Sequence, residues 1–331
     1  MSKVLSFGEI ILHYAPPVAT HYIDSHQMPF YLGGAELNVA SALAKWEVPV
    51  KYVTAMPSNF LSDTIISHLS KKNIDTTAIQ FSGNRIGCFY LATGLDMKSA
   101  GVVYDRAHSS FADIQKGTIP WAEVLKGVDW FHFSAISASL TQNATDVCEE
   151  ALVAAKALGI PISVDLNYRA KLWQYGKTPI EVMSHLVKYC TVLMGNLWAV
   201  EEMLGISSSI ATSEGSSPAV LELAAHTSMS QLKVKFPLLN TIAYTFRLAD
   251  TYFGVLCNKN NFYTSSTYKL KEVKNIVGTG DCFMAGLIYG LRNKYSAEEV
   301  INFAAAAAVG KLFELGDATD QTVEQIKKRM I

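Results

Sequence analysis

Charge is sparse and balanced in this sequence. Charged residues make up 17% of the 331 positions, and 28 Lys and Arg against 29 Asp and Glu give a formal net charge of −1. Proteins that bind nucleic acid use an excess of basic residues to neutralise phosphates, so this balance argues against a nucleic-acid partner. Apolar residues reach 50%, which excludes a disordered chain and provides material for a large core.

Cysteine and long apolar runs are scarce as well. The five cysteines are widely separated and include no C-x-x-C pair, which argues against a disulfide framework and against a structural zinc site. No apolar run is long enough to cross a bilayer, and the first residues lack the apolar core of a signal peptide. We therefore expect a soluble, cytoplasmic protein without a membrane partner.

Short β-type runs alternate with amphipathic helical stretches along the chain. The pattern predicts strands at residues 4–7, 50–55, 129–133, 160–165, 191–194 and 241–246, and helices at 35–46, 62–72, 144–158, 281–292 and 297–313. Ser62 is the expected N-cap of the second helix, and Gly159 is expected to end the third. Strands that alternate with helices indicate parallel β-α-β units, and hence an α/β fold with a doubly wound sheet.

Two stretches interrupt this alternation. Residues 13–32 carry prolines among β-formers, and residues 85–106 are β-type runs separated by glycines. We expect both to leave the α/β body and to form one small sheet. The serine-rich residues 207–218 predict a mobile loop. Because the chain shows no internal repeat and no linker, we expect one domain over residues 1–331.

The run Ile276-Val277-Gly278-Thr279-Gly280-Asp281 is the strongest candidate for a chemical site. Glycines before a helix expose backbone N–H groups at its N-terminus, where the unpaired donors and the helix dipole attract anions. A carboxylate beside a phosphate site could accept a hydroxyl proton during phosphoryl transfer. The alternative is that Asp281 only stabilises the helix dipole, and the motif alone does not decide between the two.

A second glycine motif, Gly33-Gly34-Ala35-Glu36-Leu37-Asn38, opens a predicted helix. Paired glycines allow a polyol to approach the backbone, and Asn38 offers a donor and an acceptor. Taken alone, this motif fits better a tight turn with Asn38 as a structural cap.

In this order and at opposite ends of the chain, the two motifs resemble the G-G-x-x-x-N and G-A-G-D motifs of the ribokinase-like (pfkB) sugar kinases. The runs at 7–10, 104–107, 129–134, 165–169 and 171–173 are similar to those of 2-keto-3-deoxygluconate kinases within that family. The resemblance covers nearly the whole chain. It implies a three-layer α/β/α sandwich around a mainly parallel sheet, with a small β lid from about 13–32 and 85–106. It also implies ATP and Mg²⁺ as cofactors, a sugar or sugar-acid substrate, and a homodimer or larger homo-oligomer.

The resemblance further implies a role for each matching position. Asp281 corresponds to the catalytic base, and Gly278, Thr279 and Gly280 to the amides that hold the transferring phosphate. The positions that match substrate contacts are Gly33, Gly34, Asn38, Phe89, Tyr104, Arg106, Arg169 and Asp317, and those that match nucleotide contacts are Asn167, Asn196, Arg247, Gly278 and Gly280. No metal ligand is assigned.

The two arginines matter because a keto-deoxy acid carries a carboxylate, which suits the planar donors of a guanidinium. Without the resemblance, Arg106 and Arg169 would be read as ordinary ion pairs, for example of Arg106 with Asp105 or Asp113.

The chain departs from the family pattern mainly on the nucleotide side. The family's N-x-x-E segment is Asn196-Leu197-Trp198-Ala199 here, so Ala199 replaces the Glu, while Glu201 and Glu202 lie further along and are not assigned to the site. Thr279 replaces the usual Ala. Two alternatives therefore stay open, namely a kinase of a neutral sugar such as fructose, and a catalytically impaired relative that binds sugar acids.

Overall fold

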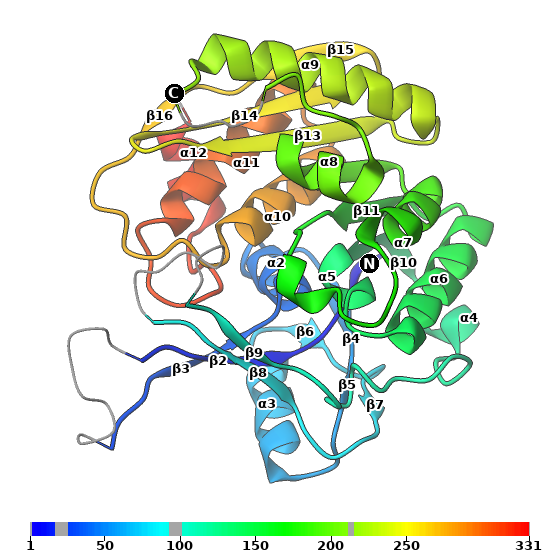
Figure 1. Cartoon of the computed structure of the whole chain (residues 1–331). Coiled ribbons are helices and arrows are strands. Elements are labelled where there is room, and N and C mark those ends of the chain that lie inside the picture. The colour runs from blue at the N-terminus through cyan, green and yellow to red at the C-terminus, as the bar shows by residue number, and fades with distance from the viewer. Residues whose placement is uncertain (1, 17–25, 93–100, 211–214, 331) are drawn as a thin grey trace.

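A large, mainly parallel sheet forms the centre of the protein (Figure 1). The computed structural model describes residues 2–16, 26–92, 101–210 and 215–330. All neighbouring pairs from β6 to β13 are parallel, whereas β14 pairs antiparallel with β13, β15 and β16. The strands run in the order β15 (Asn261–Thr264), β14 (Thr251–Asn258), β13 (Thr241–Arg247), β12 (Val192–Gly195), β11 (Ile162–Asp165), β10 (Val128–Ser134), β1 (Lys3–Phe7), β4 (Val50–Val53) and β6 (Ile74–Asp75), with β16 (Tyr268–Lys269) beside β14.

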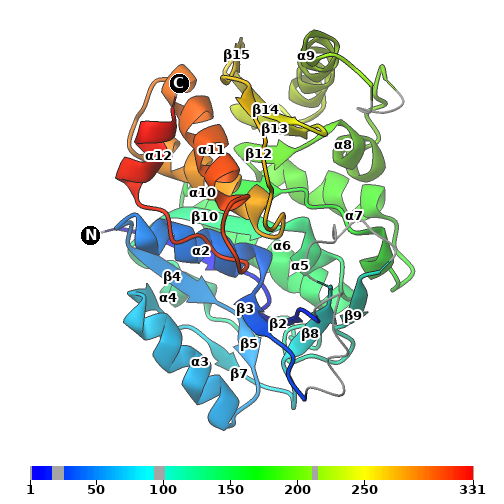
Figure 2. The same ribbon diagram turned by 90° about the vertical axis from the view of Figure 1, so that its left-hand side faces the viewer.

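Helices cover both faces of this sheet, as the side view in Figure 2 shows. Two separate sets of buried apolar side chains fill the two interfaces between helices and sheet. One face carries α4 (Trp121–Val124), α5 (Ala135–Ala138), α6 (Gln142–Ala157), α7 (Pro179–Leu186), α8 (Leu197–Leu204) and α9 (Pro218–Lys235); the other carries α2 (Ala35–Lys45), α3 (Phe60–Lys71), α10 (Thr279–Arg292), α11 (Ala297–Lys311) and α12 (Val323–Arg329). The predicted three-layer α/β/α sandwich is confirmed. No helix among the described residues is long and apolar enough to cross a membrane.

A separate four-stranded sheet stands beside the body, where the two irregular stretches were expected to meet (Figure 1). Its strands are β3 (Phe30–Gly33), β2 (Ile11–Tyr14), β8 (Gly87–Tyr90) and β9 (Val103–Asp105), in this order. It thus starts at Ile11 and ends at Asp105, close to the predicted limits. Residues 17–25 and 93–100 of the expected lid lie outside the described residues, as do residues 211–214 of the expected serine-rich loop.

Several predicted boundaries move by a few residues for local reasons. Ser62 is not the cap of α3, because Asn59 is: its Oδ1 accepts hydrogen bonds from the amides of Leu61 and Ser62, both at 3.1 Å. The helix therefore begins at Phe60. Gly159 follows α6 with φ 66°, as expected of a residue that ends a helix.

Close packing of α10 against α11 fixes the position of the candidate anion-binding turn. A Cβ atom added to Gly286 of α10 would lie 2.7 Å from the Ala304 Cα atom of α11. The two helices can approach this closely because the facing residues, from Gly286 to the buried alanines at 304–308, have little or no side chain.

We predict that Gly286→Ala lowers the free energy of unfolding by about 1–3 kcal/mol, because overpacking against a backbone outweighs the gain of about 1 kcal/mol in helix propensity. Urea unfolding measures the change. Gly290→Ala, one turn further along α10, is the matched control: its new methyl would meet a Val300 methyl at 3.1 Å and should cost less. Equal stability of wild type and Gly286→Ala would contradict the packing argument.

Candidate active site

A cavity of about 330 Å³ opens at the carboxyl ends of β11, β12 and β13, between the body and the small sheet. Ligands of open α/β sheets bind at this edge. The structure brings all but one of the predicted site residues to this cavity: Gly34, Asn38, Phe89, Tyr104, Arg106, Asn167, Arg169, Asn196, Arg247, Gly278, Thr279, Gly280, Asp281 and Asp317. Gly33 is not among the lining residues.

The two glycines of the first motif, Gly33 and Gly34, make room for different groups. Gly34 has φ 131°, and the Glu9 carbonyl oxygen occupies the space that a side chain would need. At Gly33, an added Cβ would lie 2.6 Å from an Asp317 carboxylate oxygen. Gly33 therefore makes room for Asp317, which lines the cavity in its place. The geometry explains both glycines by close approach of other protein groups.

The turn before α10 has the form expected of an anion cradle. Gly278 has φ 78°, and the Asp317 carbonyl fills the space beside its Cα atom. The first α-helical hydrogen bond runs from the Cys282 amide to the Gly278 carbonyl at 2.9 Å, so the amides before Cys282 precede the helical ladder. Beside Gly280 the space is open, since an added Cβ would meet only a Met194 methyl, at 3.7 Å. A ligand oxygen can therefore reach the backbone there.

Asp281 is buried in the first turn of α10, and burial raises the pKa of its carboxyl to about 8. The Asn38 Nδ2 atom donates a 2.7 Å hydrogen bond to Asp281 Oδ2, which favours the ionised form. The charges of Asp165 and Glu36 oppose ionisation, and Arg169 favours it. The carboxyl therefore titrates close to neutral pH, as a general base requires. Asn38 is not the helix cap of the structural alternative, since Gly34 precedes α2 and no side chain caps it.

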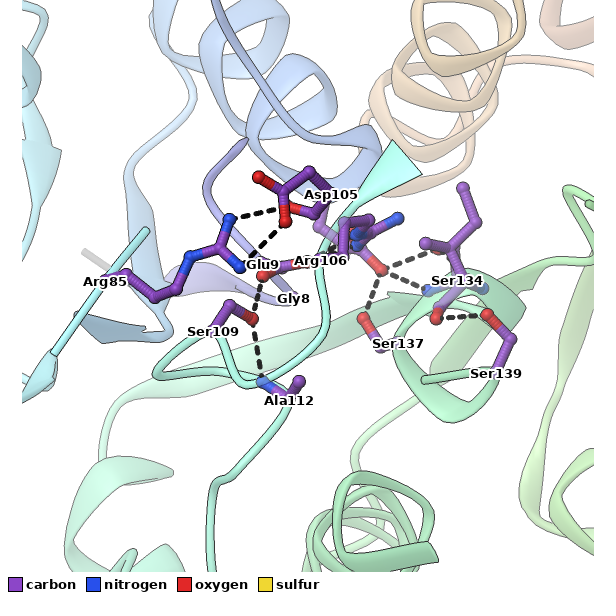
Figure 3. A network of polar contacts seen from close by, with 12 residues as sticks. Gly8, Glu9, Arg85, Asp105, Arg106, Ser109, Ala112, Ser134, Ser137 and Ser139 are labelled. Carbon is purple, nitrogen blue, oxygen red and sulfur yellow. Dashed lines mark hydrogen bonds and ion pairs between the residues drawn. The ribbon is translucent and has the colours of Figure 1, made fainter. Parts of the chain in front are cut away.

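Arg106 is held by a partner that the sequence did not indicate. Its Nε and Nη2 atoms lie 2.6 and 2.5 Å from Glu9 Oε2, and the other oxygen of Glu9 accepts a short hydrogen bond from Ser109 (Figure 3). The expected alternatives, Asp105 and Asp113, are not its partners: Asp105 pairs with Arg85 at 2.8 Å, on the edge of the small sheet.

A second buried carboxylate stands beside this pair. Glu36 of α2 accepts hydrogen bonds from the Ser134 amide (2.9 Å), the Ser134 hydroxyl (2.6 Å) and the Ser137 hydroxyl (2.7 Å), which join α2 to the end of β10 and to α5. Desolvation outweighs these bonds and raises the pKa of Glu36. Gly8 leaves room for its carboxylate.

The inner face of the small sheet carries aromatic side chains. His13, Phe89 and Tyr104 occupy directly paired positions on β2, β8 and β9. The His13 ring stacks on Phe89 with centroids 4.3 Å apart, and its Nδ1 atom lies 2.8 Å from Asp317 Oδ1. This His13–Asp317 contact ties the small sheet to the segment after α11.

The side of the cavity at the start of α8 is differently built. Asn196 Oδ1 caps α8 by accepting from the Ala199 amide at 2.9 Å, and Ala199 itself is buried. Trp198 of the same turn is 42% exposed and packs edge-on against Tyr168, with centroids 4.9 Å apart. Glu201, which the sequence analysis left unassigned, lines the cavity.

Several buried polar atoms of the lining have no hydrogen-bond partner among the described residues. Three of them are Asn38 Oδ1, Tyr104 Oη and Thr279 Oγ1. Leaving a buried polar group unpaired costs about 1–3 kcal/mol. A ligand rich in hydroxyl groups would satisfy all three, so these atoms fit a sugar.

The comparison with known proteins now decides the family. The pattern of the pfkB family of carbohydrate kinases matches residues 1–322. The chain belongs to this family.

Individual relatives agree with the assignment. The crystal structure of 2-dehydro-3-deoxygluconokinase from Thermotoga maritima superposes with a TM-score of 0.89 at 32% identity and covers 99% of both chains. The 2-dehydro-3-deoxygalactonokinase of Haloferax volcanii is 23% identical over 99% of this chain and 96% of its own. The 5-dehydro-2-deoxygluconokinase of Clostridium perfringens is 20% identical over 98% of this chain and 91% of its own.

Four residues at the site of this pfkB carbohydrate kinase were given no role by the sequence patterns. Glu9 stood in a matching run, yet nothing there indicated that it pairs with Arg106. His13 lay inside the expected lid, and Glu201 lay two residues beyond the family's Glu position. Asp165 is the last residue of the predicted strand 160–165; burial raises the pKa of its carboxyl to about 6.

We predict that Asn38→Leu moves the acidic limb of the pH profile of kcat/KM to higher pH. In the free enzyme this limb should lie near pH 8, the pKa of Asp281. A hydrogen bond to a charged group contributes about 1.5–3 kcal/mol, so losing the Asn38 donor should raise that pKa by about 1–2 units.

Asn293→Leu, an exposed change at the other end of α10, serves as the control and should leave the limb in place. If Asn38→Leu leaves the acidic limb of kcat/KM unchanged, the 2.7 Å hydrogen bond from Asn38 does not set the pKa of Asp281.

Proposed function

We propose that this kinase transfers the γ-phosphoryl group of ATP to the terminal hydroxyl of 2-keto-3-deoxygluconate or a closely similar sugar acid. Asp281 carries the proposal: it is buried at the start of α10, with its pKa near neutrality, in the same cavity as Arg106 and Arg169. The chain would act as a single ribokinase-like domain over residues 1–331, with a lid from about 13–32 and 85–106.

In the proposed reaction, Asp281 accepts the proton of the substrate hydroxyl. A bond forms between that oxygen and the γ-phosphorus, the bond from this phosphorus to the β–γ bridging oxygen breaks, and ADP leaves. The amides of Gly278, Thr279 and Gly280 donate to the oxygens of the transferring group, whose charge grows in the transition state. Closure of the small sheet excludes water, the competing acceptor.

Mg²⁺ when bound supplies positive charge to the phosphates of ATP. Among the described residues no three His, Cys, Asp or Glu side chains gather as a protein-only metal site. This fits Mg²⁺ in kinases, which needs one or two carboxylates besides the phosphates. Asp165 and Glu201 line the cavity and would hold it, in place of the Glu that Ala199 replaces.

A sugar acid is favoured over a neutral sugar by two independent observations. The cavity contains two arginines, and guanidinium groups suit a carboxylate; Arg106 already directs Nε and Nη2 to Glu9, so it would meet the substrate with its remaining N–H donors. In addition, the Thermotoga maritima, Haloferax volcanii and Clostridium perfringens relatives are all named as kinases of keto-deoxy sugar acids. A turnover panel of 2-keto-3-deoxygluconate, gluconate, fructose and ribose tests whether the substrate is a keto-deoxy acid rather than a simple sugar acid or a neutral sugar.

Ala199 supports a second candidate, a relative that binds sugar acids without turning them over. The buried base with its Asn38 donor argues for catalysis, because maintaining a desolvated carboxylate costs stability. ADP release with 2-keto-3-deoxygluconate separates the candidates, since the impaired relative would bind the acid and release none.

We also propose a cytoplasmic homodimer. On the outer face of the small sheet, Phe30 is 59% and Val103 57% exposed, and Tyr14 stacks on Tyr90 with centroids 5.2 Å apart. An apolar face of this kind is typical of an interface between subunits. The five cysteines are free and buried, as suits a reducing compartment.

We predict that Asp281→Asn lowers turnover by roughly a thousandfold, within the range of general-base catalysis, and leaves sugar binding intact. It should also stabilise the fold at neutral pH. Between the ordinary pKa of 3.8 and the folded value of about 8, the folded protein binds more protons than the unfolded chain, so Asp281 costs stability as pH rises. Asparagine removes this cost.

The gain in Tm of Asp281→Asn over wild type should therefore be larger at pH 8 than at pH 5. ADP release, sugar binding by calorimetry and thermal unfolding measure the three effects. Equal loss of binding and turnover would speak against Asp281 as the base.

We predict that the double variant Glu9→Gln/Arg106→Met loses about tenfold to a hundredfold in kcat/KM for the sugar acid relative to its change for fructose, because a charged hydrogen bond contributes about 1.5–3 kcal/mol. Arg106→Ala alone would leave Glu9 charged and buried, at a cost of about 3–5 kcal/mol.

Arg85→Met is the matched control: it removes an arginine from a half-exposed ion pair with Asp105 and should keep the preference for the acid. An equal loss for acid and fructose would refute carboxylate recognition by Arg106.

A further inference from the structure

Lys311, the last residue of α11, is a buried cation without a partner. Its relative exposure is 0%, and its Nζ atom has no hydrogen-bond partner among the described residues. Lysine is almost never fully buried unless its charge is paired. The other lysines that end helices of this layer, Lys45 of α2 and Lys71 of α3, are exposed. The packing of α11 alone therefore does not explain why a lysine stands at position 311.

The side chain of Lys311 lies directly behind the anion cradle. Its Cε atom is 3.4 Å from the point where a Cβ of Gly278 would stand, beside the Asp317 carbonyl. The loop before the cradle is bound to the segment after α11: the Lys274 amide donates to the Leu312 carbonyl at 2.8 Å, and Asn275 Nδ2 to the Gly316 carbonyl at 3.0 Å. The ammonium group is thus enclosed between the two segments that shape the cradle.

The acidic groups around Lys311 are committed elsewhere. Glu314 accepts from the Thr319 hydroxyl at 2.6 Å and from the Asp320 amide at 3.0 Å, and Asp317 is paired with His13. Burial lowers the pKa of Lys311, while the charges of Glu314, Asp317, Cys282 and Asp281 act in the opposite direction without a direct contact. The ammonium charge is therefore uncompensated at short range in the absence of substrate.

We propose that Lys311 is a positioning residue for phosphoryl transfer, whose ammonium group supplies fixed positive charge behind the Gly278 turn. This inference rests on the proposed roles of Asp281 and of the cradle. Charge fixed in a water-excluded site stabilises a developing anion strongly, because the site needs no reorganisation during the reaction. The same charge makes the free protein less stable, and the incoming phosphates offset this cost.

A structural role predicts the opposite pattern, so Lys311→Met separates the two. Methionine fills the same space without charge. We expect kcat to fall at least tenfold, the KM of the sugar to change less than twofold, and Tm to stay equal or rise. Lys45→Met, which removes a positive charge from the exposed last turn of α2, should leave all three unchanged.

The pH profile of kcat/KM provides a second test, because a Lys311 side chain that only fills space would not affect it. Several titratable or charged groups surround Asp281, and the positive charge of Lys311 favours the ionised form of its carboxyl. Removing the cation should move the acidic limb of kcat/KM to higher pH by ~0.5 unit or more. The other groups around Asp281 remain in place in this variant: Glu36, Asp165, Arg169, Cys282 and Asp317.

Chemical rescue completes the test. In Lys311→Ala, methylammonium should restore turnover at least fivefold, whereas methanol of similar size should not. An unmoved acidic limb together with unchanged kcat in Lys311→Met overturns the proposal. So does failure of both Lys311→Met and Lys311→Gln to fold, because the cation would then serve the fold. Asp281→Asn is assayed in parallel: if it keeps its turnover, the proposed catalytic base is wrong, whatever Lys311 does.

Discussion

The rest of the site depends on one desolvated carboxylate, that of Asp281. It is kept in place by a helix N-terminus on its own chain segment and by the Asn38 amide from the other end of the sequence, 2.7 Å away. Burial alone would leave a protonated acid, which cannot accept a proton; the Asn38 donor and the Arg169 charge counteract this effect. The α2–α10 contact thus joins the two sequence motifs into one site, and the Gly286–Ala304 packing brings α10 close to α11.

The buried carboxylates of the cavity are not all neutralised by a positive partner. Glu9 and Arg106 form a closed pair, Glu36 is held by serine donors, and Asp165 and Asp281 stand near each other with raised pKa values. Such an arrangement is costly in the free protein, because two carboxyls that repel each other are kept from water. Under the proposed function, ATP with its metal ion would change this balance and offset the cost on binding.

The sequence predicted the fold well where local signals and tertiary packing agree. Alternating strands and helices, the αL residue Gly159 and the two glycine motifs fixed the order of elements and the placement of the cavity. Ser62 was a wrong cap because the cap lies three residues earlier, where Asn59 accepts hydrogen bonds from the Leu61 and Ser62 amides. Gly33 matched a substrate contact, but its missing side chain serves Asp317, a residue 284 positions away in the chain (317 − 33). A sequence motif indicates that a position requires glycine, but it does not indicate which neighbouring group occupies the space of the missing side chain.

Pairings across long sequence distances explain what sequence reasoning missed on the charged side of the site. Glu9 and Arg106 are joined by the fold, and so are His13 and Asp317; nothing in their local patterns distinguishes them from surface charges. The same holds for Glu201, which is one helical turn from Leu197 and reaches the cavity because α8 starts at its edge. Ala199 therefore removes a carboxylate from one position of α8, while Glu201, two residues further along, supplies another to the lining of the cavity.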